Sequence, residues 1–195
     1  MNWLAHVFLS TDDPDFRLGN LTADLFKGSD WQGLPANAIL GVRTHRAIDA
    51  FTDAHPVVKR SMRRLGDRGL LRGVAIDIAY DHFLAKDWES FSPEPLQTFL
   101  DRFHRQASHA LPHYPPRVRD FLTRTVRINR LSRYRHPDSI HGSLQRIDTR
   151  LSQRVLRREN ASSLSPRIAE SYAEIHADFR EFLPLLQAHT ATLAP

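Results

Sequence analysis

The chain has 195 residues, of which 41% are hydrophobic and 25% are charged, a balance typical of one globular domain. It has no cysteine, which excludes disulfides, thiolate catalysis, iron–sulfur clusters and cysteine-based zinc sites. The net charge of +5 and the pI near 10.1 favour an acidic partner or substrate.

The N-terminal stretch from Met1 to Leu9 is apolar but short. It lacks a basic leading region and is followed by the acidic run Asp12-Asp13-Pro14-Asp15, so it does not have the pattern of a signal peptide. The chain also has no run of about 18 apolar residues, the length that a transmembrane helix needs. We therefore expect a cytoplasmic protein with no membrane partner.

Apolar residues recur at helical spacing along the chain, and no segment shows the alternation typical of a strand. In the first half, helices are expected over 2–9, 14–27, 36–53, 56–66 and 69–87. In the second half, apolar stripes predict helices over 96–107, 118–126, 140–155 and 168–186, with prolines between them. Pro184 is expected to kink or end the last helix. The sequence predicts one all-α domain over 1–195, a multi-helix bundle.

The segment 69–87 is apolar nearly all round except for its acids, so we expect it at the centre of the bundle. Asp77 and Asp81 are four residues apart and share one helical face. Buried carboxylates are costly unless they are paired or bound to a cation. Either Arg partners or a divalent cation can neutralise this pair, and the cation relieves their repulsion more directly. His82 lies about 100° round the helix from Asp81.

Histidine and aspartate recur on three earlier helices. His6 lies in the apolar N-terminal stretch, Asp24 follows Asn20 by one helical turn, and Asp49 follows His45 by one turn. A His–Asp pair at this spacing can bind one metal ion together or form a His–carboxylate hydrogen bond. Taken singly, each residue also fits a structural explanation: a core histidine, a solvated acid or a surface ion pair.

Together these residues offer imidazole and carboxylate groups, a donor set that suits Mn²⁺, Fe²⁺, Mg²⁺ or Zn²⁺. Most protein ligands to one divalent cation are expected to come from four residues: His6, Asp24, His45 and Asp77. Three more are expected to orient these ligands or to move protons: Asp49, Asp81 and His82. An all-α domain with inward His and Asp resembles, in general terms, the HD-type metal-dependent phosphohydrolases.

Four short motifs within residues 1–90 carry a closer resemblance. They are Asn2-x-Leu4-Ala5-His6, Gly19-Asn20-x-x-Ala23-Asp24, His45-Arg46-x-x-Asp49-x-x-Thr52-Asp53-x-His55-Pro56 and Asp77-x-x-x-Asp81-His82-Phe83-Leu84. With these motifs in this order, the chain resembles the acyl carrier protein phosphodiesterase family over most of its length. The resemblance implies hydrolysis of the phosphodiester that joins 4'-phosphopantetheine to a serine of holo-acyl carrier protein. It also implies a divalent cation, with Mn²⁺ expected, and a fold related to the HD hydrolases.

Arginine supplies most of the positive charge, and residues 117–158 hold 12 Arg against three acids. Four of these Arg residues follow the face opposite the apolar stripe of 140–155: Arg146, Arg150, Arg154 and Arg157. Because acyl carrier protein is strongly acidic, these residues are expected to bind it, with the group from Arg60 to Arg72 second. The alternative is a solvated charged face whose Arg content reflects GC-rich coding.

The basic surface also fits a nucleic-acid-binding module. However, the aromatic residues have the spacing of core positions, and such a module has no need for buried acids at Asp77 and Asp81. We therefore expect no nucleic acid as partner. An HD-like nucleotide phosphohydrolase is the alternative enzyme, and a substrate panel separates it from an enzyme that acts on carrier protein.

Overall fold

The computed structural model describes residues 1–28 and 30–193. The first half contains α1 (Trp3–Phe8), α2 (Pro14–Thr22), η1 (Ala23–Leu25), α3 (Ala36–Ala54), α4 (Pro56–Arg64), α5 (Arg72–Lys86) and η2 (Trp88–Ser90). The second half contains α6 (Leu96–Ala110), η3 (Leu111–His113), α7 (Pro116–Arg127), η4 (Ser132–Arg135), α8 (Asp138–Asp148), α9 (Gln153–Leu156), η5 (Ser162–Leu164), α10 (Ser165–Glu170) and α11 (Tyr172–Ala191). These ranges contain no strand, so the predicted all-α class is confirmed. No helix in the described part is both long enough and apolar enough to cross a bilayer.

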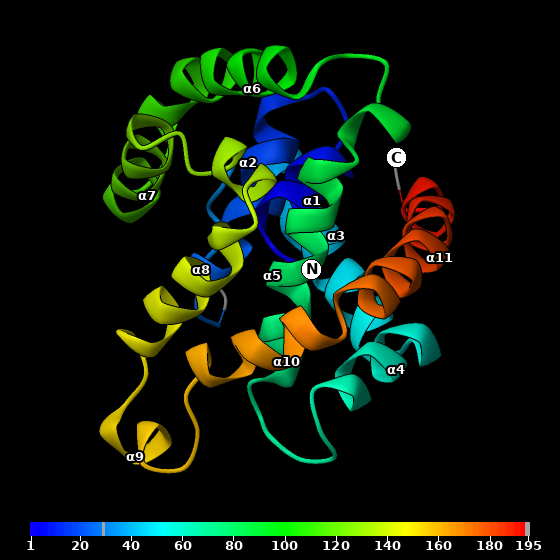
Figure 1. The fold of residues 1–195 in the computed structure, drawn as a ribbon. Coiled ribbons are helices and arrows are strands. Elements are labelled where there is room, and N and C mark those ends of the chain that lie inside the picture. Colours follow the sequence, from blue (N-terminus) through cyan, green and yellow to red (C-terminus); the bar gives the residue numbers. More distant parts are fainter. Residues whose placement is uncertain (29, 194–195) are drawn as a thin grey trace.

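Helix α5 runs through the middle of the molecule, with α8 on one side and α4 and α11 on the other (Figure 1). Every residue from Ile78 to Ala85 is buried, including Asp81 and His82. Helix α1 and η4 also pack against α5. The central position predicted for this segment is therefore confirmed, and its acids are within reach of the N-terminal helix.

Helices α2 and α3 pack with their backbones in direct contact. A β-carbon added at Gly19 would overlap the backbone oxygen of Ala38, and one added at Gly41 would overlap that of Phe16. Glycine at both positions is what permits this approach. As a result, Asn20 of α2 lies directly beside His45 of α3.

The predicted helix over 140–155 is divided. Helix α8 ends at Asp148, whose carboxylate accepts hydrogen bonds from the backbone N–H groups of Ala161 (2.6 Å) and Ser162 (3.1 Å). The chain then turns, and α9 is a separate helix of four residues. Consequently, the four Arg residues predicted on one helical face do not share a helix, although all four are exposed: Arg146, Arg150, Arg154 and Arg157.

Pro184 is expected from the sequence to kink or end its helix. The helix does not end there, because α11 continues through Pro184 to Ala191. Pro184 is exposed, so the carbonyl that loses its helical partner can bind water. Phe182 and Leu186 are buried on either side and hold both halves of the helix against the core. The break lies earlier, at Ser171, between α10 and α11.

Candidate active site

Two histidines and an aspartate meet where α1 packs near α3. The ligand atoms of His6, His45 and Asp49 lie within 4.8 Å of one another. His6 Nε2 is 3.3 Å from Asp49 Oδ1, and His45 Nε2 is 3.1 Å from Asp49 Oδ2. The two imidazole rings stack with centroids 3.9 Å apart. We call these three residues the His–Asp cluster, in which one carboxylate bridges two parallel imidazoles.

Asn20 fixes the orientation of both imidazoles. Its side-chain oxygen is 2.9 Å from His6 Nδ1, and its backbone oxygen is 2.7 Å from His45 Nδ1. Both oxygens can only accept, so each histidine donates from Nδ1 and directs Nε2 toward Asp49. The amide nitrogen of Asn20 donates to the backbone oxygen of His6 (3.0 Å) and to Ser10 Oγ (2.9 Å), which fixes the amide in turn. This second layer of hydrogen bonds is typical of ligating histidines.

Asp24 lies at the solvent side of the His–Asp cluster. It belongs to η1 rather than to α2, which ends at Thr22. Its Oδ1 is 3.2 Å from His45 Nε2, while 75% of its side chain remains exposed. The predicted association of Asp24 with His45 is therefore present, and Asp24 is the most accessible carboxylate beside these histidines.

Asp77 of α5 is connected to the His–Asp cluster through the amino group of Met1. The amino group of Met1 lies 3.3 Å from Asp49 Oδ1 and 3.2 Å from Asp77 Oδ1, so it bridges the two carboxylates. Burial opposes the charged amine, but Asp77 and Asp49 outweigh this effect and raise its pKa to about 10. Burial raises the pKa of Asp77. Asp77 thus adjoins the His–Asp cluster through a buried ammonium group.

Asp81 holds the helix that carries His6. Its carboxylate accepts hydrogen bonds from the backbone N–H groups of Leu4 (2.8 Å) and Ala5 (3.1 Å), in the first turn of α1. These N–H groups have no partner within the helix, so Asp81 caps α1 from α5. Burial raises the pKa of Asp81 to about 7. Asp81 thus fixes the helix that carries His6, and its expected role in orienting ligands or moving protons stays a prediction.

His82 faces away from the His–Asp cluster. Its Nδ1 is 2.7 Å from the backbone oxygen of Tyr134, and its Nε2 is 2.7 Å from the hydroxyl of Tyr172. Burial lowers its pKa, which favours the neutral ring. The structure therefore brings six of the seven predicted ligand and proton-transfer residues to one region and directs His82 toward η4 and α11.

The two clustered histidines have opposite protonation. Burial lowers the pKa of His6 to about 4. Burial also disfavours the charged form of His45, but hydrogen bonds to Asp24 and Asp49 outweigh it and raise the pKa to about 9. Burial disfavours the ionised form of Asp49, but the hydrogen bond from His45 and the charge of the Met1 amino group outweigh it and hold the pKa of Asp49 well below its usual range. At neutral pH, His6 is neutral, His45 is an imidazolium and Asp49 is ionised.

A cavity of about 490 Å³ adjoins this region. Asp24, Asp77 and Arg150 contribute charged groups to its lining. The rest of the lining is mostly apolar and includes Trp3, Leu21, Leu25, Val74, Ile78, Phe121 and Ile147. Such a cavity suits a ligand with one polar end and a less polar remainder.

The family model described as acyl carrier protein phosphodiesterase matches residues 1–186. The chain belongs to the acyl carrier protein phosphodiesterase family. A member from Escherichia coli O157:H7 (strain EC4115 / EHEC) is 31% identical over 198 residues and covers 100% of both chains. Members from Shigella boydii serotype 18 (30% identical, 98% of each chain) and Enterobacter sp. strain 638 (31%, 94% of each) match similarly. No solved structure matches the chain significantly.

The protein is thus a phosphodiesterase, and its structure adds functional candidates to those predicted from the sequence. Asn20 is part of a recognised motif, but its contacts with both imidazoles could not be derived from sequence spacing. Arg130 lines a small cavity together with Arg146 and Arg150. The sequence does not predict a functional role for Arg130, because one Arg in a segment rich in Arg has no distinguishing pattern.

Proposed function

We propose that this phosphodiesterase hydrolyses the bond between 4'-phosphopantetheine and a serine of holo-acyl carrier protein. The products are apo-carrier protein and 4'-phosphopantetheine. The names of the relatives support the substrate class. The observation that carries the proposal is the His–Asp cluster, in which His6, His45 and Asp49 converge next to a cavity that Asp24 and Asp77 line.

The residues present fit a divalent cation. Both Nδ1 atoms are engaged by Asn20, so the Nε2 atoms of His6 and His45 converge on Asp49. We infer that these three residues hold the cation, with Asp24 and Asp77 as additional carboxylates. An imidazole and carboxylate set of this kind is consistent with Mn²⁺. Such a cation, when bound, polarises a phosphoryl oxygen and lowers the pKa of water.

The chain's own residues perform three tasks in this reaction. Asn20 sets the tautomer of both histidines, and Asp81 anchors α1 so that His6 keeps its place. The apolar lining of the cavity receives the pantetheine arm and shields the phosphodiester from bulk solvent. Water attacks the phosphorus, the bond between phosphorus and the serine oxygen breaks, and the proton lost by the attacking water balances the proton gained by the serine oxygen. No covalent attachment to the protein is required.

The direct test is to incubate the protein with holo-carrier protein and Mn²⁺ and to weigh the carrier protein by mass spectrometry. We expect a mass loss that matches 4'-phosphopantetheine and that a chelator abolishes. An unchanged mass of the carrier protein, together with hydrolysis of nucleotides in a parallel substrate panel, would instead support the alternative function of a nucleotide phosphohydrolase.

Substitution of Asp49 tests the proposed site. Asp49→Asn removes the negative charge between the two imidazoles and should lower turnover by at least about 100-fold, the usual scale for losing a catalytic element. The matched control is Asp53→Asn, one turn further along α3, where the side chain is exposed. We expect the control to retain turnover within about twofold, because surface substitutions away from a site have small effects. Equal turnover of the two variants would remove Asp49 from the site.

A further inference from the structure

A small cavity of about 40 Å³ is lined by three guanidinium-bearing side chains, those of Arg130, Arg146 and Arg150. Arg130 is partly buried, and its guanidinium lies over the ring of Trp3, 5.0 Å from the centroid. Arg146 donates a hydrogen bond to Ser143 Oγ at 2.7 Å. We call Arg130, Arg146 and Arg150 the arginine pocket. The cavity has room for one or two small polar groups.

The arginine pocket concentrates positive charge. Throughout residues 1–28 and 30–193, the ion pairs formed by arginine involve other residues and none of these three. Arg130 Nε is buried and has no hydrogen-bond partner among the described residues. Burial, followed by the guanidinium groups of Arg146 and Arg150, lowers the pKa of Arg130. An oxyanion would satisfy the buried donor and relieve this repulsion together.

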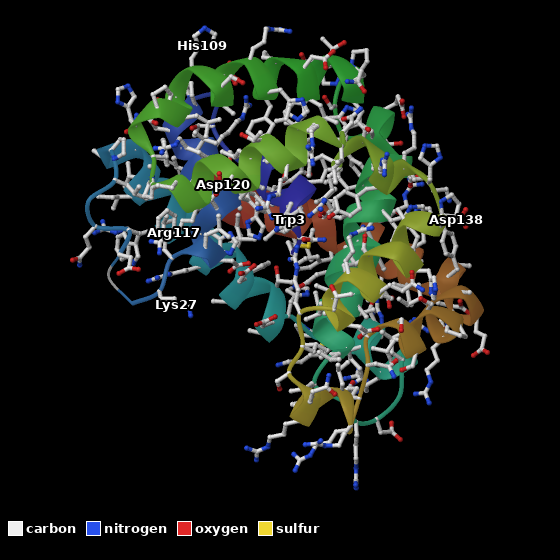
Figure 2. The ribbon with its side chains drawn as sticks, turned by 90° about the vertical axis from the view of Figure 1, so that its left-hand side faces the viewer. Trp3, Lys27, His109, Arg117, Asp120 and Asp138 are labelled. Atoms are coloured by element: carbon white, nitrogen blue, oxygen red, sulfur yellow. The ribbon has the colours of Figure 1, made fainter. Side chains whose placement is uncertain are left out.

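The arginine pocket adjoins the cavity beside the His–Asp cluster. Arg150 lines both cavities, together with Trp3 and Ile147. A third cavity, of about 340 Å³, continues from Arg130 and Arg150 to Asp120 and Arg117 of α7. Figure 2 shows Trp3 near the middle of this side of the molecule, with Asp120 to its upper left and Arg117 further to the left. A bound substrate can therefore contact the arginine pocket and the cavity lined by Asp24 and Asp77 at the same time.

We propose that the arginine pocket binds a carboxylate of the carrier protein while the phosphodiester lies at the His–Asp cluster. The inference rests on the proposed function, because the substrate's chemistry selects the ligand. The pantetheine arm carries a single phosphate, which the reaction requires at the cluster, and the remainder of the arm is uncharged. A second anion must therefore come from the acidic protein. The pocket thus distinguishes a protein-linked phosphodiester from a small one.

Binding of apo-carrier protein tests this assignment without any hydrolysis. Its dissociation constant is measured by calorimetry for the wild type, for Arg146→Gln/Arg150→Gln and for Arg105→Gln/Arg127→Gln. Both double variants remove two charges from exposed positions, but Arg105 and Arg127 do not line the cavity. We expect the pocket variant to bind at least tenfold more weakly and the control to change less than threefold, because a desolvated charge pair contributes more than a rim charge.

Two results would overturn the assignment. Equal weakening by both variants would mean that the Arg residues act as a diffuse field. Loss of binding for free 4'-phosphopantetheine, with unchanged binding of apo-carrier protein, would mean that the pocket holds the phosphate of the arm. Failure of the proposed function has a different signature. Holo-carrier protein would then remain intact with the wild type, while the calorimetric difference between the variants would be unaffected.

Discussion

At the scale of single residues, the local environment leaves one of two adjacent imidazoles neutral and the other positively charged. His6 and His45 stack at 3.9 Å, yet only His45 contacts two carboxylates through its Nε2. His6 contacts one carboxylate and is fully enclosed, so desolvation decides its protonation. A neutral imidazole is ready to bind a cation, whereas His45 must first release its proton.

This difference predicts the titration of the chelated, metal-free protein. In an NMR titration, we expect the ring of His45 to lose its proton near pH 9 and that of His6 near pH 4. The raised pKa of His45 adds stability that is fully present below about pH 6.5 and is lost as the pH rises through about 9. Asp49→Asn should lower the pKa of His45. A wild-type His45 that titrates at or below pH 6.5 would contradict this geometry.

Individual residues also show what spacing can and cannot predict. The one-turn separation of His45 and Asp49 placed both on one face of a helix, and they are in contact. The same argument placed Asp77 and Asp81 together, but Asp81 caps α1 whereas Asp77 pairs with the amino group of Met1. Spacing within one helix carries no information about which group from another helix meets each side chain.

At the scale of elements, the contact between α2 and α3 determines whether the site assembles. It brings Asn20 beside His45, and it depends on the absence of a side chain at Gly19 and Gly41. Most helices can be predicted from the sequence, since their apolar stripes are regular. The break between α8 and α9 cannot be predicted in this way, because the turn depends on the contact between Asp148 and the backbone of Ala161, which is distant in sequence.

Gly19→Ala tests the importance of that contact. The added methyl group overlaps backbone rather than a flexible side chain, so we expect the free energy of unfolding to fall by about 1–3 kcal/mol or more. The control is Gly33→Ala, where a β-carbon would meet nothing within 4 Å, with an expected change within about 0.5 kcal/mol. Both values are measured by denaturant unfolding. Similar values for the two variants would mean that α2 and α3 can separate at little cost.

At the scale of the whole molecule, the net charge of +5 would attract the acidic carrier protein that we propose as substrate. Attraction between opposite charges accelerates association and weakens as salt screens it. We therefore expect kcat/KM for holo-carrier protein to fall about tenfold or more between about 50 and 500 mM salt. Steady-state kinetics at the two concentrations check this. A flat response would mean that the Arg-rich surface does not recruit the substrate and reflects composition alone.

The most direct test of hydrolysis at the His–Asp cluster is the reaction of holo-carrier protein and Mn²⁺ in ¹⁸O-water, followed by mass spectrometry of both products. Attack of water on phosphorus predicts an unlabelled apo-carrier protein and one ¹⁸O atom in the phosphate of 4'-phosphopantetheine. Asp49→Asn should suppress the formation of both products. Label on the carrier-protein serine, or an Asp49→Asn variant that forms labelled product at the wild-type rate, would contradict the account.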